Sequence, residues 1–165
     1  MDIYDDGFLE LWKVLNKHNV QYIMVGGFAV NMHGYTRATK DADLWLKDTI
    51  ENRKNLRKAF KELGYGDFES VETMKFLPGW TQFYLNNGVL LDIMTEMKGI
   101  ERLSFDDCLS KASIADFEGI QVPFLHINHL LANKKAVDRP KDKQDIIELE
   151  KIKELRIQMG LNSPE

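Results

Sequence analysis

The segment from Val25 to Leu46, VGGFAVNMHGYTRATKDADLWL, constrains this chain more than any other part of its sequence. A glycine pair follows the apolar run QYIMV and precedes a short helical pattern, FAVNMHG. Glycines allow the backbone to approach an anion closely, and the N–H groups of the first turn of a helix favour negative charge. The segment therefore predicts either a phosphate-binding turn between a strand and a helix or a tight turn without a ligand.

Two aspartates lie near the end of this segment. Asp41 and Asp43 fall in the alternating run DADLWLK, which predicts a strand. Side chains two residues apart on a strand point to the same face, so the two carboxylates should lie together. Adjacent carboxylates repel each other unless one takes up a proton or a cation lies between them. Oxygen ligands at this spacing suit Mg²⁺ or Mn²⁺ rather than zinc, although Asp-x-Asp alone is also typical of a charged strand start.

A third acid interrupts another apolar strand. Asp92 lies in VLLDIMT, where burying an unpaired charge would be expensive. The alternative is a solvent-facing position on an edge strand. If this strand lies next to the strand of Asp41 and Asp43, three carboxylates meet and form a two-metal site. Together with the glycine pair, the pattern predicts a phosphate cradle beside a divalent-metal site.

The rest of the chain predicts a mixed sheet covered by helices. We expect helices at 5–18, 28–34, 50–64 and 104–112, strands at 21–27 and 41–47, hairpins at 80–95 and 114–125, and helices from Asn128 onward with a break at Arg139-Pro140. This order predicts an α+β fold with a mixed central β-sheet flanked by helices and a helical C-terminal segment.

The composition indicates an ordinary globular protein. The 165 residues, 44% hydrophobic and 29% charged, are enough for one core. No apolar run approaches the length of a membrane span, and MDIYDDG lacks the order of a signal peptide, so we expect a cytoplasmic protein without a membrane partner. Cys108 is the single cysteine, which excludes an internal disulfide, and the net charge of −4 argues against a generic DNA-coating protein.

The Val25–Leu46 segment resembles the signature of the nucleotidyltransferase superfamily that contains polymerase beta. Its FAVNMHG helix and R-x-T-x-D-x-D pattern are similar to small bacterial nucleotidyltransferases, among them lincosamide nucleotidyltransferases and AbiEii-like toxins of toxin–antitoxin systems. The later segment LLANKKAVDRPKDKQDI resembles the helical end of that group. The resemblance implies one nucleotidyltransferase domain over residues 1–165, with a catalytic α/β core at 1–125 and C-terminal helices at 126–165.

This resemblance also implies a reaction, in which an acceptor oxygen attacks the α-phosphorus of a nucleoside triphosphate (NTP) and pyrophosphate leaves. Asp41, Asp43 and Asp92 would be the catalytic and metal-binding residues, and Asp92 would also help to activate the acceptor hydroxyl. The acceptor stays open between a small molecule, a protein hydroxyl and a tRNA end. Because no separate acceptor-binding region is visible, a homodimer is one way to complete the cleft.

The phosphate-binding residues implied by the resemblance are Gly26, Gly27, Arg37 and Lys134, with Asp145 orienting Lys134. Many members have serine where this chain has Gly27, so a hydroxyl contact to phosphate is absent from that position. A basic cluster that includes Lys134 lies near the proposed site, where phosphate contact is credible. The spacing of the basic residues in 53–61 instead predicts a solvated helix face.

Two other interpretations remain. One is a degenerate member of the group that acts through a partner such as a cognate antitoxin, although the complete set of Asp41, Asp43 and Asp92 argues against decay. The other is a metal-dependent phosphohydrolase, which would more naturally use histidine at the metals. His33 is the only histidine near the predicted site, and its place at a helix end favours a backbone contact.

Overall fold

The computed structural model describes residues 5–39 and 41–161. Its helices are α1 (Asp6–Lys17), α2 (Gly26–His33), α3 (Ile50–Glu62), the 3₁₀ helix η1 (Glu69–Glu72), α4 (Phe105–Lys111), α5 (Ile127–Val137) and α6 (Pro140–Gln158). Its strands are β1 (Tyr22–Val25), β2 (Asp41–Leu46), β3 (Gln82–Tyr84), β4 (Leu90–Met94), β5 (Ser113–Phe117) and β6 (Ile120–Phe124).

The strands of the described residues form one sheet in the order β3-β4-β2-β1-β6-β5. The sheet is mixed, because β2 pairs in parallel with β4 and β1 in parallel with β6, whereas the other pairs are antiparallel. Both expected hairpins are present, as β3–β4 and β5–β6. The predicted α+β fold, with a mixed sheet flanked by helices, is therefore confirmed.

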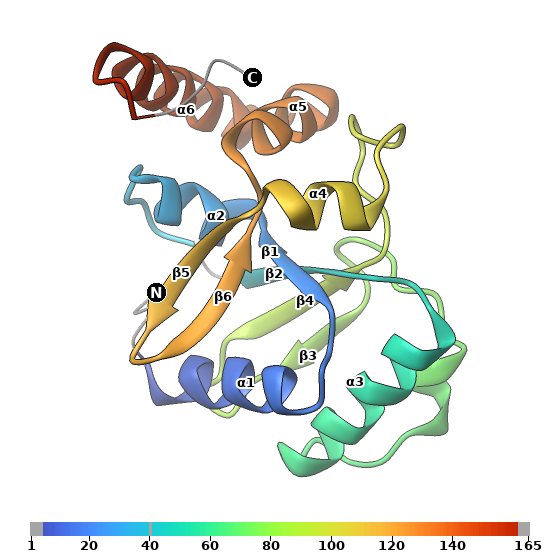
Figure 1. Cartoon of the computed structure of the whole chain (residues 1–165). Helices are drawn as coiled ribbons and strands as arrows, with labels where there is room; N and C mark the ends of the chain where they lie inside the picture. The colour runs from blue at the N-terminus through green and yellow to red at the C-terminus, as the bar shows by residue number, and fades with distance from the viewer. Residues whose placement is uncertain (1–4, 40, 162–165) are drawn as a thin grey trace.

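Helices cover the sheet on two sides (Figure 1). As drawn, α1 and α3 lie below the sheet, and α5 and α6 lie above it. The short helix α2 packs on β1 and β2 and also contacts α5 and α6. It therefore joins the C-terminal helices to the two central strands, which carry the segment singled out in the sequence.

An aromatic cluster fixes the position of α2. Trp12 of α1 stacks on Phe117 of β5 with ring centroids 4.7 Å apart, and it meets the edge of Phe28 of α2 at 5.3 Å. All three side chains are almost fully buried. Aromatic pairs in these arrangements contribute about 0.5–1.5 kcal/mol beyond the burial of their surface. The first turn of α2, which holds the glycine pair, is thus anchored by its neighbour Phe28.

The structure differs from the sequence predictions at a few boundaries. Strand β1 ends at Val25 rather than at Gly27, and the glycines instead form the first turn of α2, which begins at Gly26. The 3₁₀ helix η1 was not expected, because no periodic pattern marks residues 69–72. Among the described residues, no helix is long and apolar enough to cross a membrane.

The expectation of a solvated basic face on α3 is wrong for Arg53. Only 8% of this residue is exposed. Its guanidinium donates to Asp48 at 2.6 Å and to the carbonyl of Met74 at 2.6 Å, and it lies over the ring of Phe76. Arg53 therefore ties α3 to the segment that precedes β3, a contact that helical spacing alone does not reveal.

Candidate active site

The parallel pairing of β2 and β4 brings the three predicted carboxylates together. Asp43 of β2 is paired in register with Asp92 of β4, and Asp41 lies two residues before Asp43 on the same face. On its other side, Asp43 is paired with Val25 of β1, the residue directly before Gly26. The sheet register therefore places the acids beside the strand end that carries the glycine pair.

These groups share one cavity of about 530 Å³. Seven of the eight residues predicted for the site line it: Gly26, Gly27, Arg37, Asp41, Asp43, Asp92 and Lys134. Its volume lies within the range of roughly 300–1,000 Å³ that is typical of small-molecule sites. The eighth residue, Asp145, lies behind the wall and contacts two of the lining residues, Arg37 and Lys134.

The glycine pair makes room for side chains of the protein itself. Gly26 has a φ of 63°, and a Cβ at this position would lie 2.0 Å from Oδ2 of Asp43. A Cβ on Gly27 would lie 2.8 Å from Oγ1 of Thr39. No side chain caps the first turn of α2, so its free N–H groups have no side-chain acceptor there. The turn is therefore built for close approach, both by Asp43 and by an anion in the cavity.

The acids repel one another strongly. Burial raises the pKa of Asp43 to about 7, and the negative charges of Asp92 and Asp41 add to this rise. Burial also raises the pKa of Asp92, although a hydrogen bond from the N–H of Gly79 to Oδ2 at 2.8 Å works against it. The other oxygen of Asp92, Oδ1, is buried and has no hydrogen-bond partner in the part of the chain that the structure describes. This orphaned oxygen marks a place where a ligand is needed.

The donor chemistry fits a divalent cation. Three carboxylates on neighbouring strand positions offer the oxygen ligands that Mg²⁺ and Mn²⁺ prefer, and a cation would relieve their repulsion. Within residues 5–39 and 41–161, no three acidic, histidine or cysteine side chains already stand in the arrangement of a metal cluster. Of the two carboxylate oxygens of Asp92, Oδ2 accepts from the N–H of Gly79, and Oδ1 is the one left for a ligand.

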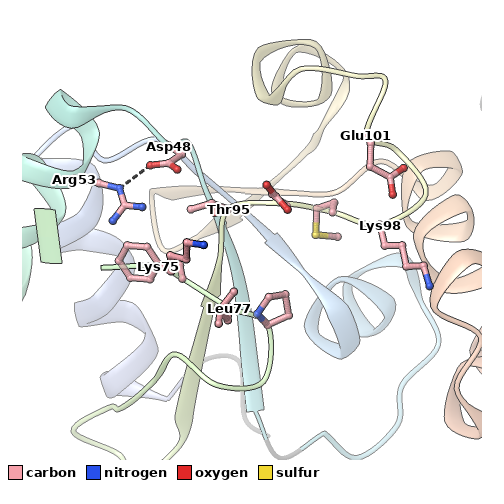
Figure 2. Close-up of a pocket in the computed structure, with 11 residues that line it drawn as sticks. Asp48, Arg53, Lys75, Leu77, Thr95, Lys98 and Glu101 are labelled. Carbon is pink, nitrogen blue, oxygen red and sulfur yellow. Dashed lines mark hydrogen bonds and ion pairs between the residues drawn. The ribbon is translucent and has the colours of Figure 1, made fainter. Parts of the chain in front are cut away.

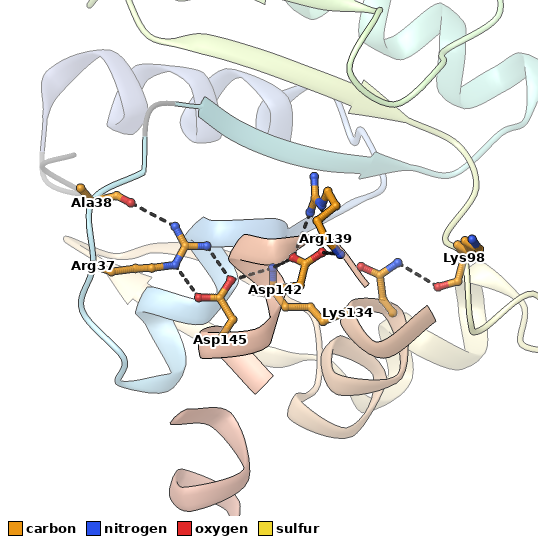
Figure 3. Close-up of polar contacts among 8 residues, drawn as sticks. Arg37, Ala38, Lys98, Lys134, Arg139, Asp142 and Asp145 are labelled. Carbon is orange, nitrogen blue, oxygen red and sulfur yellow. Dashed lines mark hydrogen bonds and ion pairs between the residues drawn. The ribbon is translucent and has the colours of Figure 1, made fainter. Parts of the chain in front are cut away.

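Basic residues form a paired network on the opposite wall (Figure 3). Arg37 donates two hydrogen bonds to Asp145, at 2.6 and 2.7 Å. Lys134 lies between Asp142 at 3.0 Å and Asp145 at 2.9 Å, and its side chain is only 3% exposed. Arg139 closes the network by donating to both oxygens of Asp142. The network thus joins the segment before β2 to α5 and α6.

The network affects which basic residues are available to bind phosphate. Arg37 and Lys134 both line the cavity, but their charges are already shared with Asp145 and Asp142. Arg139 and Lys141 line the same cavity, and both carry positive charge toward Asp43. The side chain of Arg139 is 50% exposed despite its pairing. These two residues are therefore better placed than Lys134 to meet an incoming anion.

The sequence prediction missed two residues that the structure places at the site. Asp142 is fully buried beneath Lys134 and Arg139. The available signal was its position three residues after Arg139 at a helix start that contains Pro140, where an acidic capping residue is common. Thr39 covers Gly27 with its hydroxyl. It is the threonine of the R-x-T-x-D-x-D pattern, to which no role was given.

His33 is not part of the cavity. It is buried at the end of α2, where Nε2 lies 2.7 Å from the carbonyl oxygen of Leu125 and the ring contacts Phe124. Burial lowers its pKa to about 4, although the backbone contact works in the opposite direction. The expected backbone contact is present, and the phosphohydrolase interpretation loses its only histidine close to the carboxylates.

A second hollow of about 480 Å³ adjoins the first (Figure 2). Its lining includes Asp48, Arg53, Lys75, Phe76, Leu77, Thr95 and Glu101. Pro78, Glu96, Met97 and Lys98 line both hollows, so the two are contiguous. No residue in this hollow belongs to the predicted site.

Comparison with solved structures identifies the fold. The antibiotic-resistance factor ANT(2'')-Ia matches with a TM-score of 0.59 and 18% identity over 92% of this chain and 83% of its own. The lincosamide antibiotic adenylyltransferase LnuA, in a lincomycin-bound structure, matches with a TM-score of 0.57 and 15% identity over 90% of this chain and 97% of its own.

A third neighbour is an antigenic nucleotidyltransferase-like protein from Paracoccidioides brasiliensis. It matches with a TM-score of 0.55 and 19% identity over 88% of this chain and 72% of its own. No protein-family model and no curated protein sequence matches the chain. The chain has the fold of these nucleotidyltransferase structures. At these identities the similarity is one of fold, and the activity must be argued from the site.

Proposed function

We propose that this protein is a metal-dependent nucleotidyltransferase that transfers a nucleoside monophosphate from an NTP to a hydroxyl acceptor. The observation that carries the proposal is the in-register pair of Asp43 and Asp92, together with the buried oxygen Oδ1 of Asp92, which has no hydrogen-bond partner among the described residues. A buried carboxylate without a partner is costly, and a cation or an acceptor hydroxyl would satisfy it. Residues 1–165 would act as one unit, because α2 connects the sheet to α5 and α6.

Asp41, Asp43 and Asp92 would hold Mg²⁺ or Mn²⁺, which lowers the pKa of the acceptor and stabilises the leaving oxygen. The free N–H groups of α2 and the side chains of Arg139 and Lys141 would bind the triphosphate. The Arg37–Asp145–Lys134 network would hold the phosphate-side wall in place. Thr39 offers a hydroxyl over Gly27, where many relatives have serine.

The reaction follows from this placement. The acceptor oxygen forms a new bond to the α-phosphorus, and the bond from that phosphorus to the β-phosphate oxygen breaks. Pyrophosphate leaves, and the acceptor proton passes to the carboxylate of Asp92. Oδ1 of Asp92, which has no hydrogen-bond partner among the described residues, is the oxygen that would receive this proton. The protein's own contribution is to position these groups and to exclude water from them.

A nucleotide-binding panel tests this proposal. Thermal shift is measured with ATP, GTP, CTP and UTP, each with and without Mg²⁺, on the wild type, on Asp41→Asn and on Asp116→Asn. A ligand at about a hundred times its dissociation constant stabilises the folded state by roughly 2.7 kcal/mol. We expect at least one NTP to give a Mg²⁺-dependent shift that is lost in Asp41→Asn.

The control variant, Asp116→Asn, alters an exposed aspartate on β5 and keeps an oxygen that accepts from the N–H of Gly119. It should retain the shift. Absence of a shift with every NTP would contradict the proposal and favour the alternative, in which the fold acts by binding a partner such as an antitoxin.

A further inference from the structure

Nucleotidyl transfer requires two substrates to lie side by side, and the structure offers two adjoining hollows. The carboxylate cavity measures about 530 Å³ and its neighbour about 480 Å³. Each lies within the range of roughly 300–1,000 Å³ that suits one small molecule. The glycine turn and the three acids line only the larger cavity, so the nucleotide belongs there. The second hollow is then left for the other substrate.

Asp92 lines the larger cavity, close to the lining that the two hollows share. Pro78 lines both hollows, and the next residue, Gly79, donates its N–H to Oδ2 of Asp92 at 2.8 Å. The partnerless Oδ1 belongs to the same carboxylate. An acceptor whose body fills the second hollow could therefore present its hydroxyl to Asp92 across the shared wall, without crossing the nucleotide.

The floor of the second hollow is apolar and held in place. Phe76 and Met97 are almost fully buried beneath it, and Leu77 is 50% exposed. The guanidinium of Arg53 lies 4.7 Å from the centre of the Phe76 ring and donates to the Met74 carbonyl. These contacts fix the segment before β3 that forms one wall (Figure 2). A preformed apolar floor of this kind favours a ligand with an apolar side.

The charges around this floor are balanced. Asp48 is paired with Arg53. In the part of the chain that the structure describes, Lys75, Lys98, Glu96 and Glu101 line the hollow and form no ion pair. Two groups of each sign give no net charge. A polyanion such as RNA is favoured by an excess of basic residues, and a polycation by an excess of acids.

We infer that this second hollow binds the acceptor and that the acceptor is a small amphiphilic alcohol, neutral or zwitterionic overall. The inference rests on the proposed function. It assigns Leu77 and Met97 to the apolar side of the acceptor, and it assigns the free charges of both signs to its polar groups.

The test uses a variant that fills the hollow. Leu77→Trp adds bulk to a half-exposed side chain in its lining, and Leu155→Trp adds the same bulk to an exposed position on α6 that lines neither hollow. Transfer of label from α-labelled NTPs is screened against a library of neutral and zwitterionic drug-sized alcohols. Tobramycin represents polycations, bulk tRNA represents polyanions, and casein represents protein hydroxyls.

We expect one or more library alcohols to become labelled. Because a steric change in a substrate pocket is worth about 10–200-fold, Leu77→Trp should raise the acceptor KM by at least about tenfold. The nucleotide KM should stay unchanged in Leu77→Trp, and both constants should stay unchanged in Leu155→Trp.

Several results would overturn the inference. Preferred transfer to tRNA, casein or tobramycin would exclude a small neutral or zwitterionic alcohol as the acceptor. The same conclusion would follow if the protein binds nucleotide but labels no alcohol of the library. If Leu77→Trp raises the KM for the nucleotide instead of the KM for the acceptor, the second hollow binds the base of the nucleotide. If no nucleotide binds at all, the proposed function itself fails, and the thermal-shift panel reports that separately.

Discussion

Two charged regions face each other across the cavity, and they differ in how their charges are compensated. On the α5–α6 side, Lys134 is enclosed by Asp142 and Asp145, and each of these acids also binds an arginine. On the β2–β4 side, Asp43 lies against Asp92, and one oxygen of Asp92 has no partner. Charges paired within the chain support architecture, whereas unpaired buried charges indicate a ligand.

The pKa shifts of the two regions run in opposite directions. Burial alone would raise the pKa of Asp142, but hydrogen bonds from Arg139 and Lys134 outweigh it and hold this pKa well below its usual range. The pKa of Asp145 is lowered in the same way, by Arg37 and Lys134. For Asp43, the positive charges of Lys141 and Arg139 do not outweigh burial and the acidic neighbours, and its pKa rises to about 7. Paired charges thus stabilise the fold on the α5–α6 side of the cavity, whereas buried and mutually repelling carboxylates destabilise it on the β2–β4 side.

The largest effect on stability is expected from breaking the paired side. Lys134→Met leaves Asp142 and Asp145 buried with one cation fewer, so we expect the free energy of unfolding to fall by about 3–5 kcal/mol. Urea denaturation measures the change. The matched control is Lys135→Met, because Lys135 pairs with Glu150 at the surface with a side chain 54% exposed. That change should cost at most about 1 kcal/mol. Equal costs for the two variants would show that the network is not structural.

A smaller effect is expected from pH, with opposite signs for the two regions. The folded pKa of Asp43 lies above its unfolded value, so the native state holds an extra proton between about pH 4 and 7. The stability that Asp43 contributes is present below about pH 4 and is lost as the pH rises to 7. Asp142 and Asp145 have depressed folded pKa values, so their contribution is present above about pH 4 and is lost as the pH falls.

The measurement is the urea stability of metal-free wild type and Asp43→Asn between pH 4 and 8. His33, with a pKa lowered to about 4, makes stability rise with pH in part of this window, so the comparison uses the difference between the two proteins. We expect Asp43→Asn to gain about 1–3 kcal/mol relative to wild type on going from pH 4 to 8. A difference that stays constant with pH would show that burial and the neighbouring acids do not raise the pKa of Asp43.

Local patterns in the sequence were enough to predict most of the fold. Helical periodicity, strand alternation and the turn signals at Asn86-Asn87-Gly88 and Glu118-Gly119 located nearly every element. They did not establish the order of strands in the sheet, because register between distant segments is decided by packing. The sequence therefore predicted contact between Asp43 and Asp92 only on the condition that their strands are neighbours. The structure shows that β2 and β4 are neighbours and that the two residues are paired.

The same limit explains what was missed at the site. Arg53 and Asp142 are buried and have partners in other segments of the chain. The sequence lists the charged residues but does not show which of these residues pair with one another. Arg37 was chosen without a predicted partner, yet it is bound to Asp145, and Lys134 is bound to Asp142 as well as to the predicted Asp145. The carboxylates were easier to recognise. An acid in an apolar strand is noticeable in the sequence even when its neighbours in the fold are not known.

The most direct test of the central claim is a paired measurement on Asp92→Asn. If the unpaired carboxylate serves catalysis rather than stability, transfer of label from the NTP to its acceptor should fall by at least about a hundredfold. At the same time, the urea stability of the metal-free protein at pH 7 should stay equal or rise by about 1 kcal/mol, because a repelled buried charge is removed. Loss of stability with activity retained would contradict the account.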